Sequence, residues 1–161
     1  MITTTIRLKA AYLAEYLRGK YNNCDEGPVS IPPTEDLYHV LWQFMAKRPK
    51  NASPIDEGNL TLLLPDRRVG KNPEVYNYLP ERSVHCFEES VRRMFNVELH
   101  QLMEANESDP YGVTNLDCVY RFIATYGLES ITEDALLKNY YRWRENFRKR
   151  ARRNIMRRSD S

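Results

Sequence analysis

Basic side chains are concentrated at one end of the chain, where their chemistry would be the binding of anions. Residues 138–161 hold ten of the 24 lysines and arginines and two acids, a net charge of +8, whereas residues 1–137 carry 14 bases and 20 acids, a net charge of −6. Eight of the ten bases are arginines, whose planar guanidinium matches a phosphate group. This split predicts an acidic body over residues 1–137 and a basic extension over residues 138–161, continuous within one domain.

The spacing of apolar residues places these bases on a helix over about residues 131–155. The seam Leu136, Tyr140, Trp143, Phe147 and Ala151, with Ile155 one step further, is expected to pack against the preceding helices, which leaves the basic sides exposed. Tyr141 could donate to a phosphate or stack on an unpaired base. The predicted nucleic-acid-binding residues are Lys138, Tyr141, Arg142, Arg144, Arg148, Lys149, Arg150, Arg152, Arg153, Arg157 and Arg158.

Duplex DNA is the favoured partner, because a helix about 10–12 Å wide fits the major groove. RNA or single-stranded nucleic acid is the second choice. The alternative function is a non-enzymatic assembly module, in which the basic extension binds the acidic surface of a partner protein or of a second copy. The extension could also fold onto its own acidic body or be a solvated helix end.

Residues that often bind metals are present, but their spacing does not suit a metal site. Cys24, Cys86 and Cys118 are far apart, and His85 and His100 are separated by fifteen positions. A zinc site needs about four converging ligands. The odd cysteine count without a C-x-x-C pair also fits a reducing compartment better than a disulfide framework. No metal and no cofactor are therefore expected.

Two short motifs would suit chemistry on nucleic acids, but each lacks its companions. Pro65-Asp66 is not followed by the carboxylates that a two-metal nuclease needs. Tyr140-Tyr141 beside Arg142 would suit DNA strand transfer, but no H-x-x-R or H-x-H motif accompanies it. The P-loop, G-x-S-x-G and H-E-x-x-H patterns are absent as well. The chain is therefore expected to be non-enzymatic.

The composition predicts a folded, cytoplasmic protein. Of the 161 residues, 42% are hydrophobic, which is enough for a core, and no apolar run approaches the ~18 residues of a membrane span. Residues 1–7 show no basic region followed by an apolar stretch, so no signal peptide and no membrane partner are expected.

The first half of the chain predicts short strands that alternate with helices. Strands are expected at residues 2–8, 29–31 and 60–64. Helical spacing covers residues 8–21 and 37–45, and Thr34 is the expected N-cap of the second of these helices. Residues 49–58 and 67–80 are expected to be loops.

The second half predicts three helices. A long one begins near Pro80, with the apolar face Val84, Phe87, Val91, Met94, Phe95, Leu99, Leu102 and Met103. The next covers residues 115–126, with the face Leu116, Val119, Tyr120 and Ile123, and ends at Gly127. Ser130 and Glu133 form a predicted capping box for the last helix. The helix–glycine–helix arrangement over residues 115–150 resembles a helix-turn-helix, with a longer link than usual. The alternative is a helical hairpin that carries a basic extension.

Three segments, Ile2–Leu8, Glu74–Leu79 and Ile131–Arg144, look like small uncharacterised proteins of phages, prophages and conjugative elements of gut Bacteroidales. This resemblance would cover most of the chain. It implies a bacterial or viral cytoplasmic setting and favours a DNA-linked role, and it brings no known catalytic residue. It does not choose between a regulator, a replication accessory, a packaging factor and a structural protein. The expected fold class is α+β, mostly α, with about five helices and a small sheet of two or three strands.

Overall fold

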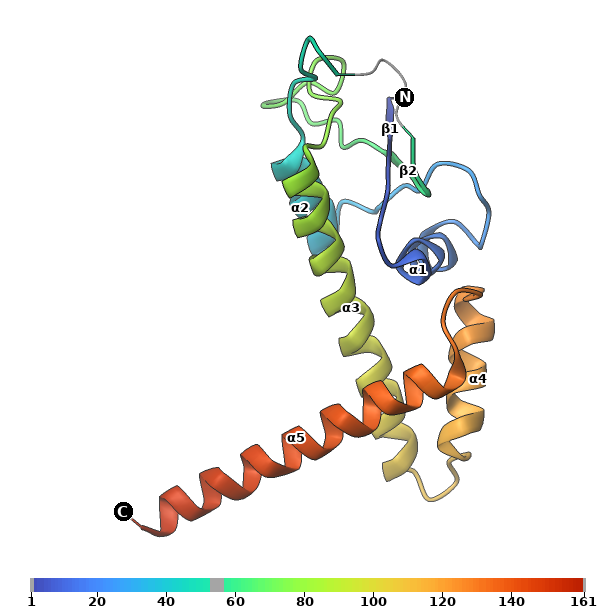
Figure 1. The fold of residues 1–161 in the computed structure, drawn as a ribbon, viewed down its shortest axis with the longest axis vertical. Helices are drawn as coiled ribbons and strands as arrows, with labels where there is room; N and C mark the ends of the chain where they lie inside the picture. Colours follow the sequence, from blue (N-terminus) through green and yellow to red (C-terminus); the bar gives the residue numbers. More distant parts are fainter. Residues whose placement is uncertain (1, 53–56, 161) are drawn as a thin grey trace. The chain divides into compact units, whose positions relative to one another are not determined.

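The computed structural model describes residues 2–52 and 57–160 and confirms the α+β, mostly α class (Figure 1). In these ranges the chain forms two strands and five helices. Their order is β1 (Thr3–Ile6), α1 (Ala11–Tyr21), α2 (Asp36–Phe44), β2 (Leu60–Leu63), α3 (Glu81–Ser108), α4 (Asn115–Tyr126) and α5 (Glu133–Ser159).

The fold divides into two compact units. Unit 1 comprises Met1–Phe95 and Thr125–Ser130, and unit 2 comprises Asn96–Ala124 and Ile131–Ser161. Helix α3 contributes residues to both. This division follows contacts, whereas the boundary predicted between residues 137 and 138 follows charge, so that boundary stays a prediction.

The sheet of unit 1 consists of β1 and β2, paired antiparallel from Thr3 opposite Leu63 to Ile6 opposite Leu60. The third predicted strand, at residues 29–31, is wrong in the described structure. Only Val29 joins β2, through hydrogen bonds from its N–H to Thr61 and from Leu63 to its carbonyl, at 2.8 and 2.9 Å. Pro32 and Pro33 follow at once, and proline cannot donate to a ladder.

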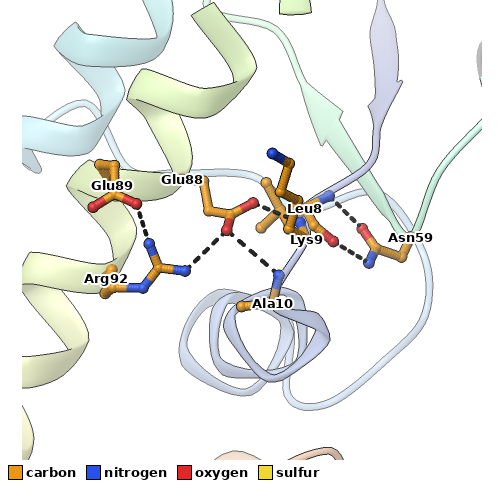
Figure 2. Close-up of polar contacts among 7 residues, drawn as sticks. All are labelled: Leu8, Lys9, Ala10, Asn59, Glu88, Glu89 and Arg92. Atoms are coloured by element: carbon orange, nitrogen blue, oxygen red, sulfur yellow. Dashed lines mark hydrogen bonds and ion pairs between the residues drawn. The ribbon is translucent and has the colours of Figure 1, made fainter. Parts of the chain in front are cut away.

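A buried carboxylate joins β1, α1 and α3 in unit 1 (Figure 2). Glu88, only 3% exposed, accepts from the backbone N–H groups of Lys9 (2.6 Å) and Ala10 (3.4 Å) and from the guanidinium of Arg92 (3.0 Å). Helix α1 begins without a side-chain cap, because its N-cap residue is Ala10. The Glu88 carboxylate accepts from the backbone N–H groups at this end, which would otherwise have no partner.

The side chain of Asn59, the residue before β2, fixes the same junction. Its amide oxygen accepts from the N–H of Leu8 and its amide nitrogen donates to the carbonyl of Leu8, both at 2.9 Å (Figure 2). Next to this junction the chain buries Leu8, Leu13 and Leu17. The polar contacts therefore fix the direction in which α1 leaves β1, and with it the position of these leucines in the core.

Two predicted helix caps are wrong. Helix α2 begins one residue later than Thr34 implies, with Glu35 as N-cap and no side-chain hydrogen bond. Ser130 does not cap α5, because its hydroxyl donates to the Glu15 carboxylate at 2.8 Å, and the N–H groups of Glu129 and Ser130 donate to the other oxygen at 3.0 Å. Thr132 caps α5 instead, accepting from Ala135 at 3.2 Å.

Unit 2 is built from the C-terminal part of α3 together with α4 and α5. Its core is formed by Leu99, Met103, Cys118, Val119, Phe122, Leu136 and Tyr140. The predicted face of α4 is therefore rotated: Leu116 and Tyr120 are 43% and 49% exposed, whereas Cys118 and Phe122 are buried. On α3, Leu102 is also exposed, unlike its buried neighbour Met103.

The apolar seam predicted on α5 is confirmed only in its first half. Leu136 and Tyr140 are buried and Trp143 is half-buried, but Phe147, Ala151 and Ile155 are exposed. The periodicity is real, but α5 continues beyond the helices that could cover it (Figure 1).

Candidate nucleic-acid interface

Helix α5 is stabilised locally along its 27 residues. Glu133 and Asp134 lie in the first turn and Arg157 and Arg158 in the last turn, which suits the helix dipole at both ends. Asp134 pairs with Lys138 at 2.9 Å one turn later. Such a helix needs less tertiary support than an average one.

A polar network holds the first half of α5 against α3 within unit 2. The Nε2 atom of His100 lies 2.6 Å from the Asn139 amide oxygen, and the Asn139 amide nitrogen donates to Asn96 at 3.0 Å. Because that amide oxygen can only accept, His100 donates from Nε2. The imidazole also stacks on the indole of Trp143, with centroids 4.7 Å apart.

Glu107 is the centre of a second network at the end of the docked half. It pairs with Arg144 at 2.5 Å and accepts from Asn115 at 3.0 Å and from the Tyr140 hydroxyl. Burial alone would raise the pKa of Glu107, but the hydrogen bonds from Asn115 and Tyr140 and the Arg144 charge together lower it. Burial, and then the bond to Glu107, raise the pKa of Tyr140 to about 12.

Beyond this network, α5 is surrounded by solvent. All sixteen residues from 145 to 160 are exposed. At 1.5 Å per residue they span about 24 Å, and Figure 1 shows this part of α5 reaching past α3 and α4 of the same unit. We refer to residues 145–160 as the arm. It carries seven bases and two acids, a net charge of +5.

The bases are spread around the arm, but one side is the richest. At about 100° per residue, Arg142, Lys149, Arg150, Arg153 and Arg157 fall within a sector of about 100°. Arg148 and Arg152 lie on a neighbouring side, where Arg152 donates to the carbonyl of Arg148 at 3.4 Å. A linear polyanion could therefore follow the basic sector along the axis of the helix.

The structure separates nine of the eleven predicted residues into two groups. Lys138, Arg144 and Lys149 have acidic partners, and the Lys149 pair with Glu145 is a loose 3.7 Å. Tyr141 belongs to the docked network: its hydroxyl accepts from Asn115 at 3.3 Å and its ring lies 4.9 Å from the Arg144 guanidinium.

The other group keeps its charge available. Over residues 2–52 and 57–160, no carboxylate lies within salt-bridge distance of five of the predicted arginines. They are Arg142, Arg148, Arg150, Arg153 and Arg157.

Sequence reasoning missed the residues that divide these groups. Glu107, Asn115, His100 and Asn96 lie at least 26 positions from their partners on α5. The polar residues His100 and Asn139 on otherwise apolar helix faces were the only signal in the sequence.

Among the residues that the structure describes, no three histidine, cysteine, aspartate or glutamate side chains are grouped to hold a metal ion. In the same part of the chain, no helix is both long and apolar enough for a membrane span. No family model, curated protein or solved structure matches this chain.

Proposed function

We propose that this protein binds nucleic acid, with duplex DNA as the preferred partner, through the arm and the adjacent Arg142. The observation that carries the proposal is the exposure of all sixteen arm residues in a helix with a net charge of +5. Arginines held on a solvated helix can reach phosphates without first giving up an internal partner.

The physical basis is the release of counterions. Each phosphate neutralised by an arginine frees condensed cations, so affinity falls steeply as salt rises. Contacts by about five arginines predict a slope of roughly −4 to −5 in log K against log salt on duplex DNA. Phosphate contacts fix position but read no sequence. The proposed role is that of an accessory or regulatory factor, non-enzymatic and cytoplasmic, in a bacterial or viral setting.

The decisive experiment neutralises arginines that have no internal partner. In the full chain, Arg148, Arg153 and Arg157 are changed together to Gln, and binding to duplex DNA, single-stranded DNA and RNA is titrated in increasing salt. We expect at least a tenfold loss of duplex affinity and a shallower salt slope, because about three phosphate contacts disappear.

The matched control changes Lys50, Arg68 and Arg93 to Gln. These residues are exposed in unit 1 and give the same change in net charge. Equal losses in the two variants would mean that total charge, and not the arm, attracts the polyanion. A salt-independent affinity, or none, would contradict the proposal. Tighter binding to RNA or to single strands would replace duplex DNA as the partner.

A second function is favoured by the apolar residues of the same arm. Phe147, Ile155 and Met156 are 55%, 69% and 68% exposed, which is unusual on a surface meant only for phosphates. A partner protein with an acidic, partly apolar surface, or a second copy, would cover both kinds of residue.

Changing Phe147 and Ile155 to Ser separates the two functions. If the arm binds nucleic acid, duplex affinity stays within about twofold, because the counterions released are the same. If the arm is an assembly module, light scattering of the unchanged protein shows oligomers that the double variant lacks, and neither protein binds DNA.

A further inference from the structure

A hollow of about 590 Å³ lies on the surface of α5 within unit 2, at the inner end of the arm. Its lining recurs at helical spacing along one side of the helix and includes no acidic residue. The lining residues are Ala135, Lys138, Asn139, Arg142, Trp143 and Asn146. Lys138 pairs with Asp134 at 2.9 Å, whereas Arg142 forms no ion pair with any carboxylate in the described ranges of the chain. The hollow therefore combines an aromatic ring with an available guanidinium.

The hollow continues the basic side of the arm. At about 100° per residue, four of the six lining residues fall within the sector that holds Arg153 and its neighbouring bases, and Lys138 and Trp143 lie about 20° beyond its two edges. Within this sector, Arg157 and Arg142 are about 22 Å apart along the axis of the helix. A strand whose phosphates follow these bases inward along the arm is therefore led to Trp143.

The indole of Trp143 is held in one orientation by neighbouring rings. Its centroid lies 4.7 Å from the imidazole of His100 and 5.6 Å from the ring of Phe147, with the planes inclined by 18° and 26°. His100 is in turn bonded to Asn139 at 2.6 Å. Trp143 is only half-buried, so part of the indole stays exposed beside the hollow. A ring fixed in advance loses little conformational entropy when a flat partner packs against it.

From this placement we propose that the hollow takes an unpaired base, from a single-stranded tail that continues one strand of the bound duplex. Aromatic side chains beside cations are the surfaces on which proteins stack unpaired bases. A paired base is stacked between its neighbours and cannot offer its face. The inference rests on the proposed function, because the arm has to bring the strand to the hollow. The preferred substrate is then a tailed duplex, with Arg142 on the phosphate beside the base and the base against Trp143.

Three duplexes of one sequence test the inference on the full chain. One is blunt, one carries a short single-stranded tail, and one carries an abasic tail with the same number of phosphates. We expect the tailed duplex to bind at least about fivefold more tightly than the abasic one, which is the lower end of the range for stacking one base on an aromatic side chain.

The outcomes separate this inference from the proposed function. Equal affinities for the tailed and abasic duplexes would overturn the inference and leave the proposed function intact, whereas no binding of any duplex would overturn both. A free single strand of the tail sequence that binds as tightly as the tailed duplex would also overturn the inference, because the duplex would then contribute nothing.

Trp143→Leu removes the ring from the hollow and retains an apolar side chain. We expect the preference for the tailed over the abasic duplex to fall to within about twofold, while the affinity for the blunt duplex is unchanged because the arm keeps its arginines. Tyr120→Leu is the matched control, since it removes an aromatic side chain that is 49% exposed on α4 of the same unit, and it should keep the preference. A preference that survives Trp143→Leu would overturn the inference.

A cross-linking measurement on the unchanged protein makes the test independent of the fold of Trp143→Leu. The tail carries 5-iodouracil at one position at a time, and irradiation attaches this base to an aromatic side chain in contact with it. Mass spectrometry of the digested complex should locate the adduct on Trp143. Adducts found only on other residues, or none from any position of the tail, would overturn the inference.

Discussion

At the scale of single residues, carboxylates on α3 decide which cations are available. Glu107 engages Arg144, and Glu88 engages Arg92, so neither arginine is presented to solvent as a simple charge. Among the described residues, Arg148, Arg150, Arg153 and Arg157 of the arm form no ion pair with a carboxylate, and no other helix of unit 2 extends beside this part of α5 (Figure 1). The same residue type is therefore structural at position 144 and available for binding nine residues later.

His100 gives unit 2 a dependence on pH. Burial is the main influence on the imidazole and lowers its pKa below 6.5, in spite of the opposing hydrogen bond with Asn139. The unfolded chain then binds the proton more readily than the folded chain. Stability from neutral His100 is complete above pH 6.5 and is lost as pH falls through 6.5 toward the folded pKa.

We therefore expect the free energy of unfolding to fall between about pH 7.5 and pH 5.5, and His100→Gln to flatten this slope. Denaturant titrations across this range provide the measurement. His85→Gln is the matched control, because it removes an exposed imidazole from the same helix. Glu107 contributes only at lower pH, since its lowered pKa acts below 4.5. A slope that survives His100→Gln would exclude His100 as the source.

At the scale of elements, α5 is one helix with two kinds of support. Its first half has tertiary contacts, including buried Leu136 and Tyr140 and the hydrogen bonds of Asn139. Its second half depends on propensity, end charges and the Glu145–Lys149 pair. An exposed pair of this kind contributes only about 0.3–0.5 kcal/mol, so the arm is the less stable half.

Glycine substitutions distinguish these halves. Ala151→Gly costs about 1 kcal/mol of local helix stability. In the arm this cost should appear as lost helicity by circular dichroism, with the unfolding temperature unchanged. Ala135→Gly in the docked half should instead lower the unfolding temperature by about 2–4 °C. An equal fall for Ala151→Gly would show that the arm is packed, as it would be in an oligomer.

Local patterns predicted most of the elements, but not what each one packs against. Both strands, the limits of α4 and its end at Gly127, which has φ of +62°, were predictable from the sequence. The Ser130 cap was not, because the carboxylate of Glu15, more than a hundred positions away, accepts from the Ser130 N–H and hydroxyl that the capping box would use. The buried extent of the α5 seam depends on where α3 and α4 end, which periodicity does not encode.

At the scale of the whole molecule, the candidate site was easier to predict than its boundaries. The excess of arginine in residues 138–161 is counted directly from the sequence, without knowledge of the fold. Tyr141 and Arg144 are not available in the same way as the arm arginines, because they contact Asn115 and Glu107. Only the tertiary structure brings these two residues to α5. Residues 1–137, with a net charge of −6, would repel the polyanion proposed as the partner, which would favour contact through the arm.

The solvated arm also has a consequence for evolution. Where no neighbour fills the space around a side chain, selection acts on a substitution only through its charge and its effect on helix formation. Homologues should therefore shuffle, lengthen or shorten residues 145–160 freely while they retain the His100, Asn139 and Glu107 contacts. The length of the arm, and with it the number of contacts to the proposed partner, can then differ between lineages while the rest of the fold stays the same.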